Sequence, residues 1–166
     1  MRGAMVIDGY CNNPAANQKA WLPSEDGWFR TGDKGRFNAN TKELNLTGRI
    51  KDRFKIRELE VAPVEVEDQL KKHPEIVDAH ITTTPARHAE NLSECKAYIV
   101  LCKDSQLTAQ GVVDYVASVL AAHKAPTGAV VFCKEIPRGA MGKPVRTLLE
   151  RVQPLPGSAQ FLRQPI

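Results

Sequence analysis

The sequence has few aromatic residues, little net charge and no long hydrophobic run. Phe, Trp and Tyr make up 6% of its 166 residues, and the formal net charge is +4. A balance of 23 basic and 19 acidic residues excludes the strong positive field of a dedicated duplex-DNA-binding protein. No apolar stretch has the length of a membrane-spanning helix, and the N-terminus has no signal-length apolar segment. We therefore expect a cytoplasmic protein with no membrane span and no nucleic-acid partner.

Cysteine is also scarce, and its spacing excludes the common metal sites. The four cysteines form no Cys-x-x-Cys pair and have no histidine at metal-ligand spacing. We therefore expect no metal site and reduced thiols. Cys95, Cys102 and Cys133 lie in or beside apolar runs, which favours structural roles over reactive ones.

The apolar and charged fractions, 42% and 25%, are typical of a globular protein that buries a core, and the length allows one domain and a smaller subdomain. Residues 1–47 are rich in turn signals, including those at 12–14, 24–27 and 38–40, between strand-like pieces at Ala4–Ile7, Trp28–Thr31 and Glu43–Leu46. Residues 48–58 contain five basic and two acidic residues, the densest charge cluster of the chain. This cluster predicts a boundary between residues 1–47 and the rest of the chain.

After Pro63 the pattern becomes regular. Pro63 and the acidic residues after it favour a helix that ends before Pro74, and Thr108 favours the start of a second helix that reaches Ala122. The remaining expected elements are a half-buried strand at 77–81, a loop through Pro85, a more apolar strand at 97–102, a strand at 130–136 and a short helix at 144–152. The order α-β-β-α-β-α predicts a small α+β domain in which helices flank a short sheet.

Three short segments combine glycine with charge: Thr31-Gly32-Asp33, Gly48-Arg49-Ile50-Lys51-Asp52 and Gly139-Ala-Met-Gly142-Lys143. A carboxylate after glycine can bind sugar hydroxyls, and a Gly-Lys on a loop can reach a phosphate. Surface turns carry the same residues routinely, so each segment alone favours an ordinary turn.

Taken in order, the segments carry a stronger signal. They belong to an ordered series of segments along the chain. In order, the series is 27–33, 48–52, Val61-Ala-Pro63-Val-Glu65-Val-Glu67, His73-Pro74-Glu-Ile-Val-Asp78-Ala79, Ala122-His-Lys124-Ala-Pro126 and the stretch from Ile136-Pro137 to Arg146. This series resembles the C-terminal part of the adenylate-forming enzymes, a superfamily of acyl-CoA synthetases, aryl-CoA ligases, beetle luciferases and peptide-synthetase adenylation domains. The spacing is nearest to the acyl-CoA ligase branch.

The resemblance implies a mobile α+β domain preceded by a small β subdomain. The domains would be a remnant β subdomain of a large N-terminal domain (1–47), a hinge (48–52), the mobile C-terminal domain (53–152) and a tail (153–166). It also implies a reaction in two steps: a carboxylate attacks the α-phosphate of ATP to give an acyl-adenylate, and the thiol of coenzyme A then displaces AMP.

The resemblance assigns roles residue by residue. Lys143 is the catalytic lysine of the adenylation step, where charge builds on the α-phosphate. Asp33, Arg49 and Thr31 bind the nucleotide, with Asp33 accepting hydrogen bonds from the ribose hydroxyls. Lys51 is the hinge position. Lys55 and the segment to Glu58 form the loop that faces the thiol tunnel.

The resemblance also implies what the chain lacks. In the complete enzyme, the phosphate loop and the acyl pocket belong to the N-terminal domain, and the ligands are ATP with Mg²⁺, coenzyme A and a carboxylic acid. We therefore expect no tight binding of these ligands and no ligase activity by this chain alone. The expected partner is the missing N-terminal domain or an intact ligase.

Two alternatives remain open. Glu58 replaces a glycine of most relatives and Met141 replaces a Ser or Thr, which favours a truncated stand-alone module that binds a partner enzyme without ligase activity. A repurposed small biosynthetic enzyme is the other alternative, in which His80, His88 or His123 would act as an acid or base. No partner for these histidines is evident at catalytic spacing in the sequence.

Overall fold

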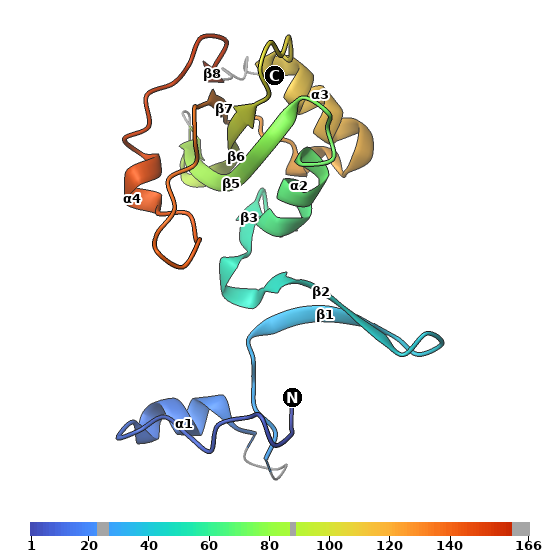
Figure 1. Cartoon of the computed structure of the whole chain (residues 1–166), viewed down its shortest axis with the longest axis vertical. Coiled ribbons are helices and arrows are strands. Elements are labelled where there is room, and N and C mark those ends of the chain that lie inside the picture. The colour runs from blue at the N-terminus through green and yellow to red at the C-terminus, as the bar shows by residue number, and fades with distance from the viewer. Residues whose placement is uncertain (23–26, 87–88, 161–166) are drawn as a thin grey trace. The chain divides into compact units, whose positions relative to one another are not determined.

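The computed structural model describes residues 1–22, 27–86 and 89–160 (Figure 1). Contacts divide the chain into two units, Met1–Lys51 and Asp52–Ile166. The 3₁₀ turn η1 (Ile50–Asp52) contains the division point. Most of the predicted turn at 24–27 and residues 161–166 of the predicted tail lie outside the described residues.

The first unit contains one helix and a two-stranded ribbon. Its elements are α1 (Pro14–Ala20), β1 (Asp33–Asn38) and β2 (Glu43–Arg49), the two strands pairing antiparallel. The helix begins at Pro14 because the Asn13 side chain accepts a hydrogen bond from the Ala16 amide at 3.1 Å. None of the residues described in this unit is buried. Local hydrogen bonds and partial apolar contacts therefore hold it together.

Several expectations for the first unit are wrong. The turn signal at 12–14 is the start of α1, because Asn and Pro also form a helix N-cap and first turn. Residues 4–7 contain a turn and a bend instead of a strand, and the predicted strand at 28–31 is reduced to a single bridge between Trp21 and Phe29. The strand at 43–46 is confirmed and extends to Arg49, paired with β1, which the sequence did not predict.

The second unit is built on a four-stranded mixed sheet preceded by a small hairpin. Its elements are β3 (Phe54–Ile56), β4 (Leu59–Val61), α2 (Pro63–Leu70), β5 (Ile76–Ala86), β6 (Ala89–Leu101), α3 (Ala109–Val119), the 3₁₀ turn η2 (Ala122–Lys124), β7 (Ala129–Phe132), α4 (Arg146–Leu149) and β8 (Ala159–Gln160). The sheet order is β5-β6-β7-β8, with only the β6–β7 pair parallel. The α+β class predicted from the sequence is confirmed.

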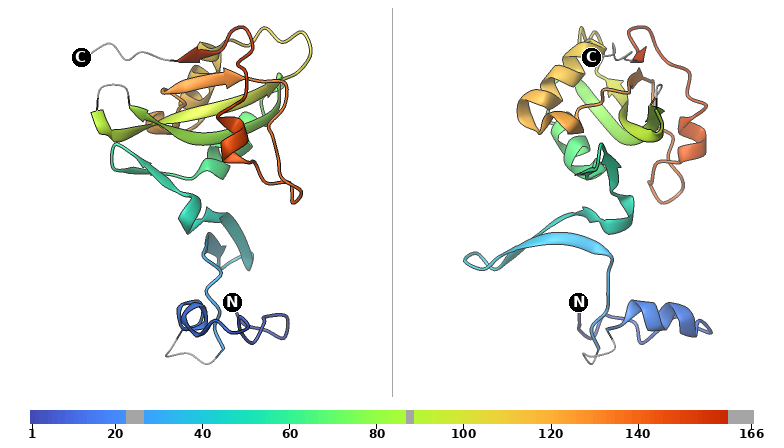
Figure 2. Two further views of the ribbon diagram at one scale, coloured as in Figure 1. Left: turned by 90° about the vertical axis from the view of Figure 1, so that its left-hand side faces the viewer. Right: turned by 180° about the vertical axis from the view of Figure 1, so that it is seen from behind.

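Both faces of this sheet are buried. Residues of β6 alternate between two apolar clusters, because Ala97 and Ile99 lie with the residues of α2 and α3, whereas Tyr98 lies with Leu149 of α4. Figure 2 shows α3 and α4 on opposite faces of the sheet. The second unit thus has the buried apolar clusters that the first unit lacks.

Most regular elements of the second unit are confirmed, with shifted ends. Thr108 caps α3 as predicted, its side chain accepting a hydrogen bond from the Gly111 amide at 3.0 Å. The helix ends at Val119, which is exposed, and so does not reach Ala122. Pro85, expected in a loop, lies within β5 opposite Ser93, and an edge strand tolerates proline because one row of its amides needs no strand partner. The strand at 130–136 ends at Phe132, and the last helix spans only Arg146–Leu149.

Candidate functional site

The three residues predicted to bind a nucleotide lie together at one end of the β1–β2 ribbon. Asp33 and Arg49 are register partners, and Arg49 Nε lies 3.4 Å from Asp33 Oδ1. The Thr31 hydroxyl accepts a hydrogen bond from the Asp33 amide at 3.0 Å. Gly32, between them, has φ +76°, a left-handed conformation that glycine adopts without steric cost. The ribbon thus fixes the Asp33 backbone and sets a cation beside its carboxylate.

The Asp33 carboxylate keeps acceptor capacity toward solvent. Its side chain is 29% exposed, and that of Arg49 is 60% exposed. Among the described residues, Asp33 Oδ2 has no hydrogen bond or ion pair. An ionised carboxylate accepts hydrogen bonds only, so this oxygen suits hydroxyl donors.

Lys143 lies on a compact exposed turn of the second unit. The Gly142 amide donates to the Gly139 carbonyl and the Gly139 amide donates to the Lys143 carbonyl, both at 2.9 Å. Gly142 has φ +75°, which again favours glycine. The Lys143 side chain is exposed and has no hydrogen-bond or ion-pair partner within the described part of the chain. Its ammonium is therefore available to an incoming anion.

Arg138 ties this turn to the sheet. Its Nη1 donates to the Gly142 carbonyl at 2.9 Å and its Nη2 to Asp78 Oδ2 on β5 at 2.7 Å. Asp78 Oδ1 accepts a hydrogen bond from the Ala79 amide at 2.9 Å and lies 3.3 Å from Lys71 Nζ. Burial by itself would raise the pKa of Asp78, but Arg138, the Ala79 amide and Lys71 outweigh it and hold that pKa below its ordinary value. Sequence analysis did not find this network.

The segment predicted to face a thiol tunnel, Lys55 to Glu58, comprises the end of β3 and the two turn residues of the β3–β4 hairpin. Arg57 and Glu58 have φ of +50° and +64°. Two successive left-handed residues are typical of a type I′ turn, which favours glycine at its second position. Lys55 Nζ lies 3.3 Å from Glu58 Oε2, and the Glu58 side chain is 88% exposed. The predicted hinge residue, Lys51, is an exposed member of η1.

Two other segments of the ordered series meet in the second unit. Lys124 Nζ in η2 lies 2.7 Å from both carboxylate oxygens of Glu65 in the first turn of α2. This ion pair joins the start of α2 to the segment after α3. The sequence does not predict this pair, because nothing local indicates a contact between residues 59 positions apart.

The histidines and cysteines have structural surroundings. His80 has a partner that is not evident in the sequence, since its Nδ1 lies 2.8 Å from Glu67 Oε1, which also accepts a hydrogen bond from the Ile81 amide at 2.9 Å. His88 lies outside the described residues, and His123 is in η2.

Cys95 and Cys133 are free thiols buried in the core, as expected. Burial raises the pKa of Cys95 to about 12 and also raises that of Cys133.

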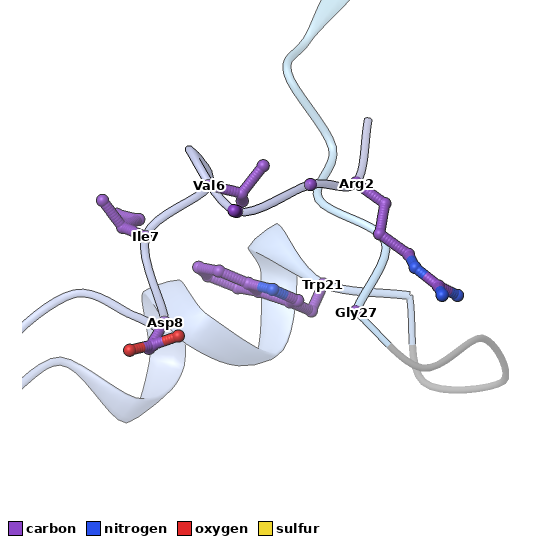
Figure 3. Close-up of a pocket in the computed structure, with 8 residues that line it drawn as sticks. Arg2, Val6, Ile7, Asp8, Trp21 and Gly27 are labelled. Carbon is purple, nitrogen blue, oxygen red and sulfur yellow. The ribbon is translucent and has the colours of Figure 1, made fainter.

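A hollow in the first unit is separate from the predicted site residues. Its lining includes Arg2, Val6, Asp8 and Trp21 (Figure 3).

Within the described residues, no group of three or more His, Cys, Asp and Glu side chains could hold a metal ion. No helix in the described ranges is long and apolar enough to cross a membrane.

The geometry is that of a small α+β domain carrying an exposed lysine turn, preceded by a ribbon with a carboxylate–arginine pair. Comparison with known proteins gives this arrangement a family. Residues 65–143 match the AMP-binding enzyme C-terminal domain. The chain contains this domain of the adenylate-forming enzymes, and its relatives include acyl-CoA ligases and luciferases.

Three relatives illustrate the match. The phenylacetyl-CoA ligase epaB of Aspergillus niger is 39% identical over 150 residues, which cover 90% of this chain and 27% of that protein. The luciferin 4-monooxygenase of Photinus pyralis is 36% identical over 143 residues, covering 86% of this chain and 25% of that protein. The structure of O-succinylbenzoate coenzyme A synthetase (MenE) from Bacillus subtilis in complex with AMP matches 90% of this chain and 29% of its own, with a TM-score of 0.74 and 28% identity. The chain spans about a quarter of the length of these relatives.

Proposed function

We propose that this chain serves as the C-terminal part of an ATP-dependent acid–CoA ligase that acts through an acyl-adenylate. The observation that carries the proposal is the exposed Lys143 side chain on a preformed turn, at the last residue of the matched domain. The AMP-bound relative supports a nucleotide as the ligand. The acyl pocket and phosphate loop of such an enzyme lie outside the quarter of the relatives' length that this chain spans.

In the first step, a carboxylate oxygen of the acid attacks the α-phosphorus of ATP, and the bond to the β-phosphate breaks to release pyrophosphate. Negative charge builds on the α-phosphate oxygens as this happens. Lys143 would meet that charge, because a compact ammonium on a long stem can reach it and an exposed turn can withdraw it afterwards. In the second step, the coenzyme A sulfur attacks the acyl carbonyl carbon and AMP leaves.

Asp33 and Arg49 would hold the nucleotide during this sequence. The free Oδ2 of Asp33 suits a ribose hydroxyl, while Oδ1 stays beside Arg49. Arg49, being mostly exposed, has guanidinium donors left for ribose or phosphate oxygens. Lys51 is the proposed hinge, and Lys55 to Glu58 the proposed face toward the thiol. ATP would bring Mg²⁺, which neutralises phosphate charge when bound.

The test is a chimera in which this chain replaces the matching segment of the phenylacetyl-CoA ligase, with phenylacetate as the acid. We expect ATP–pyrophosphate exchange in the chimera and a loss on the order of 10²- to 10³-fold in the Lys143→Ala variant. The matched control is Lys103→Ala, which removes another exposed lysine with no partner among described residues. An inactive chimera, or equal effects of the two substitutions, would contradict the proposal.

A second candidate is a binding module without ligase activity, and Glu58 favours it. A charged side chain in a left-handed turn occupies the place where the resemblance expects glycine. In that case the wild-type chimera forms no phenylacetyl-CoA from preformed adenylate, and Glu58→Gly restores at least part of this activity, because the charged side chain is the feature that favours this candidate. Thioester formation by the wild-type chimera would exclude this candidate.

A further inference from the structure

One arginine holds the Lys143 turn to the rest of the second unit. The turn from Gly139 to Lys143 is exposed, and its own backbone supplies only the two hydrogen bonds between Gly139, Gly142 and Lys143. Exposed turns with so few contacts open easily. Arg138 adds two side-chain contacts, to Gly142 within the turn and to Asp78 on β5.

The chemistry of Arg138 suits this position. A guanidinium is a planar fork that can donate in two directions at once, whereas an ammonium is a point charge. Here one arm reaches the carbonyl directly before Lys143, and the other meets a carboxylate at 2.7 Å. Asp78 is itself held by the Ala79 amide and by Lys71 on the other side. The contact therefore links the turn to the buried sheet through a fixed anchor.

We propose that Arg138, anchored by Asp78, is a positioning residue that fixes the turn so that Lys143 arrives at the α-phosphate in one conformation. This inference rests on the proposed function of Lys143. Arg138 does not touch substrate. It acts by keeping the Gly142 carbonyl and the following lysine in place, and a misplacement of about 1 Å in a reacting group can cost on the order of 100-fold in rate.

The first experiment measures the turn without any activity. In the complete 166-residue chain, amide hydrogen exchange of Gly139 and Gly142 is compared between the wild type and Arg138→Ala. We expect exchange at these two amides to accelerate about tenfold or more, while the core amide of Ile99 on β6 stays protected. Unchanged exchange at Gly139 and Gly142 overturns the proposal, and so does equal acceleration at Ile99, because Arg138 would then support the whole unit.

The second experiment uses the chimera with the phenylacetyl-CoA ligase and separates the two half-reactions. Arg138→Ala should lower the rate of adenylate formation by about 10- to 100-fold with little change in the KM for ATP. Thioester formation from preformed adenylate should stay within about twofold, since Lys143 acts in the first step only. Asp78→Asn should lower adenylation in the same direction but less, because an amide oxygen still accepts a hydrogen bond.

Arg151→Ala is the matched control, since Arg151 is an exposed arginine after α4 whose side chain makes no hydrogen bond or ion pair with a described residue. A loss in both half-reactions would indicate a merely structural role and overturn the proposal, as would an equal loss in Arg151→Ala. If Lys143→Ala leaves adenylation unchanged, the proposed function fails. If Lys143→Ala lowers adenylation and Arg138→Ala does not, only the positioning role fails.

Discussion

The two units of the chain use apolar residues in opposite ways. In Asp52–Ile166, side chains such as Leu70, Ile99 and Val130 are at most 2% exposed and form one core under α2 and α3. In Met1–Lys51, Phe37, Leu44 and Leu46 are all more than 60% exposed on one face of the β1–β2 ribbon. Buried apolar area is what stabilises a fold, so we expect the second unit to carry the cooperative stability of the chain.

The site residues are divided in the same way. Asp33 and Arg49 lie on the unit without buried residues, whereas Lys143 is tied through Arg138 and Asp78 to the sheet of the other unit. A lysine that must reach a phosphate and leave again is better placed on a rigid body than on a loose one. The proposed nucleotide-binding pair lacks such support within the described residues of its own unit. The following predictions test this contrast.

Cysteine labelling gives the largest expected difference between the units. Cys11 in the first unit is exposed, and Cys95 in the second is buried with a pKa raised to about 12, so only about one Cys95 thiol in 10⁴ is ionised at pH 8. At pH 8 we expect iodoacetamide to modify Cys11 at least 10³-fold faster than Cys95 in the native chain, as measured by peptide mass spectrometry. In urea the two rates should converge. Comparable native rates would mean that the second unit opens as easily as the first.

The sequence was most informative where a local signal coincided with burial. Pro63 and Thr108 predicted the starts of α2 and α3, and both helices have buried faces. Asn13 and Pro14 carry the same type of signal, yet the sequence does not predict α1. This helix has no buried apolar face, so its residues show no helical periodicity of apolar side chains. Pro85 was misassigned because the tolerance of an edge strand for proline depends on the sheet order, which local sequence does not contain.

The same limit applies to the candidate site. Asp33, Arg49 and Lys143 could be found as members of an ordered series of motifs, since each stands beside a glycine. The contact of Arg138 with Asp78 spans 60 residues, and the cross-strand pairing of Asp33 with Arg49 depends on a register with an irregularity between Lys34 and Gly35. Such contacts follow from the folded arrangement rather than from spacing.

A matched pair of leucine substitutions tests whether the core resides in one unit. Leu70 is fully buried at the end of α2, and Leu46 is 64% exposed on the ribbon. We expect Leu70→Ala to lower the free energy of unfolding by about 3 kcal/mol, because it leaves a cavity in the core. Leu46→Ala should change it by less than about 0.5 kcal/mol. Urea unfolding of both variants measures the difference, and similar losses would show that the ribbon belongs to the same cooperative core.

A second matched pair concerns the two hairpins and gives the smallest expected effect. Glu58 in the β3–β4 turn and Lys42 in the β1–β2 turn both have left-handed backbones, with φ of +64° and +60°. Glycine relieves this strain at either position, although its flexibility in the unfolded chain offsets part of the gain. The two hairpins differ in their attachment, because Ile56 and Val61 of the β3–β4 hairpin are buried in the core of the second unit.

We therefore expect Glu58→Gly to raise the free energy of unfolding by roughly 0.5–1 kcal/mol, because the strain is released only in the folded second unit. Loss of the Lys55–Glu58 ion pair, whose charged atoms are 3.3 Å apart and largely exposed, lowers the free energy of unfolding only slightly. Lys42→Gly should leave the main urea transition unchanged, since a ribbon without buried residues is not part of that transition. An equal gain in both variants would mean that the β1–β2 ribbon unfolds together with the core, and the proposed nucleotide-binding pair would then rest on the same support as Lys143.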